Sequence, residues 1–207
     1  IETTDAGDGM AKLLIQKAYE AGAIPLVNTY YLSVRRAMIM GMTEEQAEEW
    51  TRYDEEKMKN MQAYVSVRGG YNSLELTDIP HERMSLYESI YYKRVHFGHR
   101  IPNTKWVVLR YPNPSMAQLA DMSTEAFEDF YFNVCNLDYG KMDKAMDALK
   151  ALLERTDKVR LTAKNTDLTF SIKGLPAIKC AGRVNIPDGE VFTAPVRDSV
   201  NGVITYN

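Results

Sequence analysis

The side chains used most often in zinc and redox sites are scarce in this sequence. It has two cysteines, Cys135 and Cys180, and three histidines. The two cysteines lie far apart and form no C-x-x-C pair, which excludes the usual cysteine spacing of structural zinc sites and thioredoxin-like redox sites. We therefore expect both thiols to be reduced and partly buried.

Long apolar runs and long charged runs are also absent. No apolar stretch reaches the roughly 18 to 20 residues of a spanning helix, and the N-terminus lacks the basic and apolar segments of a signal peptide. The formal net charge is -3, spread without a basic run, whereas partners that present phosphate require a basic patch. We expect a globular, cytoplasmic protein with no nucleic acid and no membrane among its partners.

Several catalytic and phosphate-binding motifs are missing. The sequence contains no G-x-G-x-x-G, no G-x-x-x-x-G-K-S/T and no G-x-S-x-G, so it gives no direct sign of a dinucleotide fold, a P-loop or a nucleophile elbow. Gly7-Asp8-Gly9 resembles a phosphate loop only faintly and is equally typical of a helix N-terminus. The pair His96-x-x-His99 has a spacing that can hold zinc, but one pair without a nearby third ligand is weak evidence for a metal site.

Helix and strand patterns alternate over the first three quarters of the chain. Strand-like runs cover residues 1–4, 24–31, 62–68 and 104–111, and helix-like runs cover residues 10–20, 35–61, 81–99, 124–134 and 142–155. The second helical run divides at a capping box that starts at Thr43. Run 24–31 is largely apolar, as in a strand buried on both faces. We predict an α/β domain over residues 1–156, with a Rossmann-like, mostly parallel sheet and flanking helices.

From Lys158 the pattern changes to a period of two, with glycines between short strands, which is typical of antiparallel β-structure. We predict that residues 157–207 begin a second, β-rich domain that is incomplete. Ile1–Thr4 and Val203–Tyr206 look like parts of strands, so we expect the chain to be a fragment that lacks material at both ends, with its first strand truncated.

Turn-forming strings lie on both sides of Glu190, so the position of this acidic residue can be predicted more clearly than that of the others. Pro187-Asp188-Gly189 precedes it and Asn201-Gly202 follows it, and both strings favour turns. Glu190 should then start a strand, where a carboxylate held on a rigid edge suits a hard or borderline metal ion. From spacing alone, a surface glutamate beside a hairpin is the simpler interpretation, and a metal ligand is the alternative.

Longer strings of the sequence resemble a known family. They are residues 111–118, 122–130, 165–174, 180–182, 185–195 and 198–202. Together they resemble the thermophilic metalloaminopeptidases of the aminopeptidase T and aminopeptidase S type, and the G-E-V-F-T-A-P string at Gly189–Pro195 is the most specific of them. The resemblance is close over the last hundred residues or so, whereas the first hundred agree only in the order of elements.

The resemblance implies a metal-dependent aminopeptidase that removes N-terminal residues from peptides. Enzymes of this family use two divalent metal ions (Zn, Co, Mg or Mn) held by two glutamates, histidines and an aspartate, with a tyrosine near the site. Glu190 matches the first of these glutamates, and His81, His96 and His99 match no ligand motif of the family. The other ligands and the tyrosine would follow Asn207. We therefore expect the fragment to bind metal weakly or not at all and to be inactive alone, and the full-length protein to form a homodimer that acts on peptide substrates.

A different class of function stays open. The chain could be a non-catalytic α/β module that binds a nucleotide or another small molecule, or that mediates dimerisation. In that case the loops after Thr4, Gly69 and Tyr111 should form the site, because open α/β sheets bind ligands at the carboxyl ends of their strands.

Overall fold

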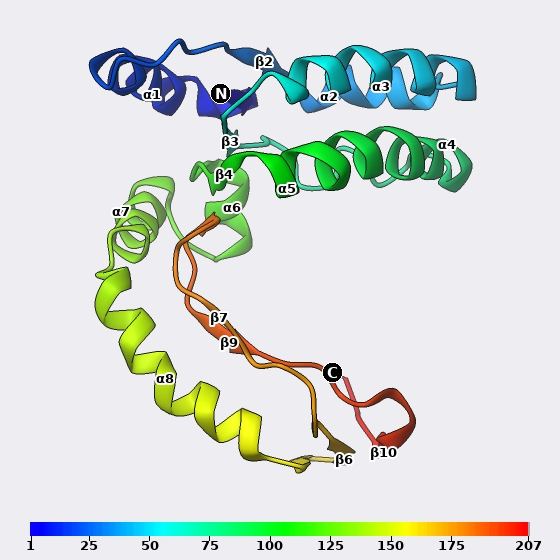
Figure 1. Cartoon of the computed structure of the whole chain (residues 1–207), viewed down its shortest axis with the longest axis vertical. Helices are drawn as coiled ribbons and strands as arrows, with labels where there is room; N and C mark the ends of the chain where they lie inside the picture. Colours follow the sequence, from blue (N-terminus) through cyan, green and yellow to red (C-terminus); the bar gives the residue numbers. More distant parts are fainter. Residues whose placement is uncertain (207) are drawn as a thin grey trace. The chain divides into compact units, whose positions relative to one another are not determined.

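The computed structural model describes residues 1–206 (Figure 1). Contacts divide the chain into two compact units: unit 1 comprises residues 1–135 together with 184–186, and unit 2 comprises residues 136–183 and the chain from Pro187 onward. The predicted boundary at residue 156 stays a prediction. By contacts, the helix before that residue groups with the strands after it.

Unit 1 contains the parallel sheet that the alternating pattern predicts. Its strand order is β2-β1-β3-β4-β8, and all four neighbouring pairs are parallel. The bounds are β1 Glu2–Thr4, β2 Asn28–Tyr30, β3 Ala63–Arg68, β4 Lys105–Arg110 and β8 Asn185–Ile186. β2 lies on one side of β1 and β3 on the other, so the chain changes direction across the sheet at the β1/β3 position. Open α/β sheets bind ligands at such switch points.

Two features of this sheet differ from the sequence-based expectation. The run 24–31 is not a strand buried on both faces: only Asn28–Tyr30 is extended, it is an edge strand, and Ile24 is 89% exposed. The apolar residues Ile24, Leu26 and Val27 precede the strand and are exposed, so the apolar part of the run does not enter the sheet. The sheet also gains β8 from a distant part of the chain, because Asn185 and Ile186 pair in parallel with Val108 and Leu109 of β4.

The helices of unit 1 lie on both sides of this sheet, with α1 on one side and α3 on the other (Figure 1). Their bounds are η1 Asp5–Gly7, α1 Asp8–Glu20, α2 Leu32–Met40, α3 Glu44–Lys59, α4 His81–Leu86, η2 Tyr87–Arg100, α5 Ile101–Asn103, α6 Pro114–Leu119 and α7 Thr124–Cys135. The N-cap of the predicted capping box is confirmed at the start of α3, where the Thr43 hydroxyl accepts a hydrogen bond from the Gln46 backbone N–H at 3.2 Å.

The predicted helix over residues 81–99 is helical throughout, but its second part is a π-helix. Tyr87–Arg100 (η2) continues α4 without a break and leads into α5. A π-helix has i→i+5 hydrogen bonds and is rare beyond a single turn. Because the i→i+5 bonds widen each turn of the helix, residues four apart lie nearly above one another. The ring of Tyr87 stacks on that of Tyr91 at a centroid distance of 5.3 Å, and the ring of Tyr92 stacks on that of His96 at 4.6 Å.

Three apolar clusters form the core of unit 1. The first surrounds Ile39 and Met42 between α2, α3 and α4; the second joins α3, β3 and η2; and the third packs α6 against α7 through Ala117 and Phe127. The second cluster consists of Met58, Tyr64, Tyr91 and Val95. It fixes η2 against the sheet and against α3, so the side chains of η2 that face the carboxyl ends of the strands have a rigid support.

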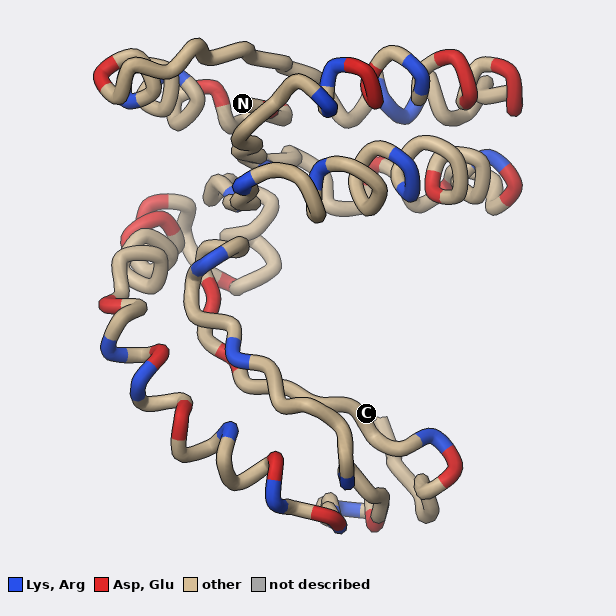
Figure 2. Tube along the Cα trace, in the orientation of Figure 1, with Lys and Arg blue, Asp and Glu red and all other residues tan. Residues whose placement is uncertain are grey.

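Unit 2 contains α8 (Tyr139–Arg155) and two small antiparallel sheets, as the period of two predicts. One sheet has the order β10-β6-β5, with β5 Lys158–Ala163, β6 Thr166–Ser171 and β10 Asn201–Val203; the other pairs β7 Ile178–Cys180 with β9 Glu190–Phe192, and a short helix η3 spans Arg197–Ser199. Acidic and basic residues alternate along α8 (Figure 2).

One turn prediction in unit 2 is wrong. Asn201-Gly202 forms no turn but lies in β10, where Gly202 pairs with Leu168 of β6. The φ angle of Gly202 is 126°, and a Cβ atom here would collide with the carbonyl oxygen of Asp167. The glycine is thus required for close approach of two strands rather than for a turn. Among residues 1–206, no helix combines the length and the apolar character that a membrane crossing requires.

Candidate functional site

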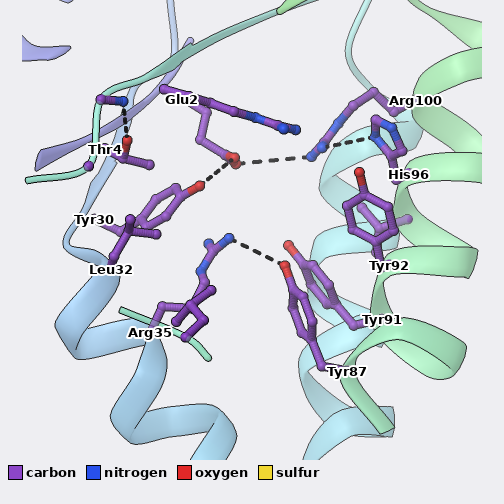
Figure 3. A pocket seen from close by; sticks show the side chains of 15 residues that line it. Glu2, Thr4, Tyr30, Leu32, Arg35, Tyr87, Tyr91, Tyr92, His96 and Arg100 are labelled. Carbon is purple, nitrogen blue, oxygen red and sulfur yellow. Dashed lines mark hydrogen bonds and ion pairs between the residues drawn. The ribbon is translucent and has the colours of Figure 1, made fainter. Parts of the chain in front are cut away.

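A cavity of about 250 Å³ lies in unit 1 at the carboxyl ends of β1, β2 and β3 (Figure 3). The strands contribute Glu2, Thr4, Tyr30 and Arg68, and the facing side is formed by η2. The remaining residues that line it are Leu32, Arg35, Gly69, Gly70, Leu76, Tyr87, Tyr91, Tyr92, Val95, His96 and Arg100. The cavity is therefore at the β1/β3 switch point, where the topology favours ligand binding.

Hydrogen bonds and close packing hold the loops around this cavity. The hydroxyl of Thr4 accepts a hydrogen bond from the Gly69 backbone N–H at 2.7 Å, which ties the end of β1 to the loop after β3. A Cβ atom on Gly70 would lie 2.6 Å from Cδ1 of Leu32, so this loop passes close to the start of α2 and a larger residue would require the Leu32 side chain to shift. Asp5 has a φ angle of 39°, and its carboxylate accepts from the Leu32 backbone N–H at 3.4 Å.

Glu2 is the acidic residue of the cavity lining, and its carboxylate accepts hydrogen bonds from tyrosine hydroxyls. Tyr64 donates to Oε1 of Glu2 at 2.9 Å and Tyr30 at 3.4 Å, while Nη2 of Arg100 lies 4.0 Å from the other carboxylate oxygen. Burial, followed by the charge of Glu2, raises the pKa of both tyrosines. Both hydroxyls therefore keep their protons at neutral pH and act as hydrogen-bond donors.

Two arginines are stacked on aromatic rings at the wall. The guanidinium carbon of Arg35 is 3.6 Å from the ring centroid of Tyr30, and Nη1 donates to the Tyr87 hydroxyl at 3.5 Å (Figure 3). The guanidinium carbon of Arg100 is 3.7 Å from the ring centroid of Tyr64. Stacking of this kind stabilises a guanidinium ion without neutralising its charge.

His96 lies in the same wall and is neutral. Its Nδ1 is 3.3 Å from Nη1 of Arg100. Burial, then the positive charges of Arg100 and Arg68, lower the pKa of His96 to about 4. The imidazole can thus exchange hydrogen bonds with a ligand at neutral pH without contributing charge.

Glu190, the metal ligand expected from the sequence, lies in unit 2. It is exposed and is the first residue of β9, as predicted, opposite Cys180 of β7. Burial, followed by the charges of Asp188 and Glu190 and a hydrogen bond to Glu190, raises the pKa of the Cys180 thiol. Asp188 itself accepts from the Gly182 backbone N–H at 2.8 Å. Both cysteines are free and partly buried, as expected.

The described residues do not form a complete metal centre. No group of three or more His, Cys, Asp or Glu side chains within residues 1–206 is placed to hold a metal ion. His96 and His99 do not converge, since His96 faces the cavity whereas Nε2 of His99 lies 3.4 Å from Oε1 of Glu55. A structural or catalytic zinc needs at least three protein ligands. Glu190 alone does not meet this requirement, so we derive no step of a metal-dependent reaction from this part of the chain.

Sequence reasoning located the cavity only in part. The loops after Thr4, Gly69 and Tyr111 were expected to form a site. Gly69 and Gly70 do line the cavity, but of the first loop only the preceding residue Thr4 does, and the loop after Tyr111 does not. Glu2 and Arg100 gave no signal, because they lie almost a hundred residues apart and meet only through the packing of η2 on the sheet.

Comparison with known proteins identifies the family. The family profile described as thermophilic metalloprotease (M29) matches residues 1–207. The fold is similar to that of wild-type AmpT from Thermus thermophilus, with a TM-score of 0.68 and 19% sequence identity over 97% of this chain and 57% of that one. This chain thus spans little more than half the length of that structure. No curated protein matches the sequence. Because the family match extends over the whole sequence, the chain belongs to the thermophilic metalloprotease (M29) family.

Proposed function

We propose that the full-length protein is a metal-dependent aminopeptidase and that Glu190 is one of its metal ligands. The observation that carries this proposal is the family match over residues 1–207. The position of Glu190 supports it, because an exposed carboxylate at the first residue of β9 can reach a metal ion without rearrangement of the strand. Peptides with a free N-terminus are the corresponding substrates.

The chemistry of such enzymes explains why one carboxylate is not sufficient. Bound divalent ions lower the pKa of a water molecule and polarise the scissile carbonyl group. We infer that the other ligands lie outside residues 1–206, since the described residues contain no further cluster of metal-binding side chains. The chain of 207 residues should then bind divalent metal weakly and hydrolyse nothing, because one carboxylate does not offset the dehydration of a dication.

Three finer points are part of the same proposal. The metals are two divalent ions chosen from Zn, Co, Mg and Mn; the full-length protein is a homodimer; and it acts in the cytoplasm. The family supports divalent metal as such. Metal analysis by mass spectrometry, light scattering of the full-length protein and cell fractionation test the three points separately.

Replacing Glu190 by Gln in the full-length protein tests the proposal. Glutamine keeps the shape of the side chain and removes its charge. Hydrolysis of an aminoacyl reporter substrate should fall by about 100-fold or more, because loss of a mere supporting residue of a metal site already costs roughly 10- to 100-fold. Glu154→Gln is the matched control, because Glu154 is another exposed carboxylate of unit 2 and, within the described residues, its ion pair is with the partly buried Lys150 of its own helix.

The two possible results are clearly separated. We expect Glu154→Gln to keep the activity of the unchanged protein and Glu190→Gln to lose it at every concentration of added metal. Equal turnover of all three proteins would refute the role of Glu190. Hydrolysis by the 207-residue chain alone would refute the inference that the other ligands lie elsewhere.

A further inference from the structure

We propose that the cavity of unit 1 binds a small organic anion, namely a planar ring that carries one carboxylate or phosphate group. The proposal does not depend on the peptidase activity, because every residue that lines the cavity belongs to unit 1. Four observations support it: the charge balance of the lining, one buried guanidinium group, the aromatic wall, and the position and size of the cavity.

The charged residues of the lining are unbalanced. Three arginines face one carboxylate, that of Glu2, and Glu2 already accepts hydrogen bonds from two tyrosines. Within residues 1–206, Arg35 and Arg68 form no ion pair, and Arg100 reaches Glu2 only at 4.0 Å. Most other arginines of the chain have a carboxylate at shorter distance, for example Arg36 with Asp78. The cavity thus has an excess of positive charge, which attracts an anion.

Arg100 is a buried cation with an unused donor. The residue is 7% exposed, and its Nε makes no hydrogen bond in the described part of the chain. A buried charged donor without an acceptor is costly, and buried cations are normally paired with an anion and fully hydrogen-bonded. An oxyanion in the cavity would supply the missing charge, and its oxygens are the acceptors that guanidinium groups bind best.

The wall opposite the strands is aromatic. Tyr87, Tyr91, Tyr92 and His96 project from successive turns of η2 towards the space that also contains Arg35 and Arg100 (Figure 3). Burial raises the pKa of Tyr87 and Tyr91, so these hydroxyls stay protonated; that of Tyr91 donates to Oδ2 of Asp54 at 2.7 Å, and that of Tyr87 accepts from Arg35. Aromatic rings that alternate with guanidinium groups suit a flat ligand with a charged edge.

Position and size restrict the ligand further. The cavity opens at the β1/β3 switch point, where α/β sheets bind their ligands. Its volume of about 250 Å³ lies just below the range of roughly 300–1,000 Å³ that is typical of drug-sized ligands. It therefore accommodates a single ring with one substituent, and it is too small for a dinucleotide. The lowered pKa of His96 agrees with this assignment, because part of it arises from the positive charges of Arg100 and Arg68.

Binding of simple aryl anions tests the proposal. Benzoate and phenyl phosphate are titrated by calorimetry into the full-length protein after treatment with a chelator, so that bound metal does not capture the anion. We expect saturable binding of at least one of them in the millimolar range or tighter, and a rise in Tm at saturation. Preference for benzoate identifies a carboxylate ligand, and preference for phenyl phosphate identifies a phosphate ester. Benzyl alcohol, which is neutral, should bind about tenfold more weakly or not at all.

Arginine variants test whether the anion binds in this cavity. Arg35→Gln and Arg68→Gln should each weaken anion binding by about tenfold, because each removes a charge-assisted contact. Arg68 is exposed, so its replacement leaves the packing intact even if Arg35→Gln disturbs the stacking on Tyr30. Arg36→Gln is the matched control, because Arg36 is adjacent in α2 but pairs with Asp78 outside the cavity.

The proposal is overturned if neither anion binds, if benzyl alcohol binds as tightly as the anions, or if binding is equal in the Arg35, Arg68 and Arg36 variants. These outcomes are independent of the assay for Glu190, which measures hydrolysis and metal content. Failure of the proposed function would therefore leave the result for the cavity unchanged.

Discussion

The two units of this chain differ in how completely they bury their apolar side chains. Unit 1 contains three buried clusters, in which Ile39 and Met42 are completely inaccessible to solvent. Unit 2 buries few large side chains, and Leu161 and Phe192 in its strands remain nearly half exposed. The same difference separates the two candidate sites. In unit 1 several charged groups converge on one cavity, whereas Glu190 in unit 2 lies on an exposed strand and belongs to no group of three or more metal-binding side chains among the described residues.

This difference shows what each kind of evidence can identify. Convergence of side chains from distant parts of the chain requires a packed scaffold, and only unit 1 shows it among the described residues. Glu190 was found instead from a continuous string of residues around it, which does not depend on packing. Geometry therefore indicates the anion site, and family resemblance indicates the metal ligand.

The largest stability effect should come from the first core cluster. Ile39→Ala removes a fully buried side chain and should destabilise unit 1 by about 2–5 kcal/mol. Leu161→Ala removes a side chain that is 46% exposed and should cost roughly 1 kcal/mol or less. Urea unfolding measures both: the two tryptophans, Trp50 and Trp106, lie in unit 1 and report on it by fluorescence, while circular dichroism follows the whole chain. Equal losses of stability would mean that unit 2 is as well packed as unit 1.

A smaller effect tests the tightest contact in unit 2. Gly202→Ala places a Cβ atom against the carbonyl oxygen of Asp167, at a backbone position with φ of 126°. Strain of this kind costs about 1–3 kcal/mol. Hydrogen exchange should show loss of protection for the β6 and β10 amides and little change in unit 1. Unchanged protection in β6 would contradict the pairing of these strands.

A third effect concerns the pH dependence of unit 1. Because the folded state holds the pKa of His96 at about 4, below the ordinary value of 6.5, the unfolded chain takes up this proton first as the pH falls. The stabilisation is complete above pH 6.5 and is lost as the pH decreases through 4. Glu2, Arg68 and Arg100 set the local field around the ring.

His96→Gln should therefore make the stability of unit 1 less dependent on pH between 6.5 and 4, as measured by Tm from tryptophan fluorescence. His81→Gln serves as the control, because His81 is exposed at the start of α4. Parallel Tm curves for the His96 variant and the unchanged protein would show that this histidine is not buried as a neutral group.

The sequence predicts most of the fold because local patterns specify it. The capping box at Thr43, the strand-like run 62–68 and the period of two after Lys158 all predicted elements that the structure contains. The errors occur where a distant partner decides the outcome. Residues 24–31 read as a buried strand, but only the strand order shows that β2 is at the edge. Likewise, no local pattern shows that Asn185–Ile186 pairs with β4.

The candidate sites, too, were predictable only where the signal is local in the sequence. Glu190 could be named because its surroundings are continuous in sequence, and the structure confirms that it starts a strand; its role as a metal ligand stays a prediction. The cavity could not be named in full, because Glu2, Arg35 and Arg100 belong to three separate elements and meet only after η2 packs on the sheet. The π-helical form of η2 was not predictable from the residue types in it.

Metal stoichiometry of the full-length protein tests the central claim most directly. Divalent metal bound per chain is measured by plasma mass spectrometry after gel filtration, for the unchanged protein and for Glu190→Gln. The account predicts that the unchanged protein retains divalent metal and that the variant loses at least one equivalent under the same conditions. Identical metal content in both proteins would contradict the assignment of Glu190 as a ligand.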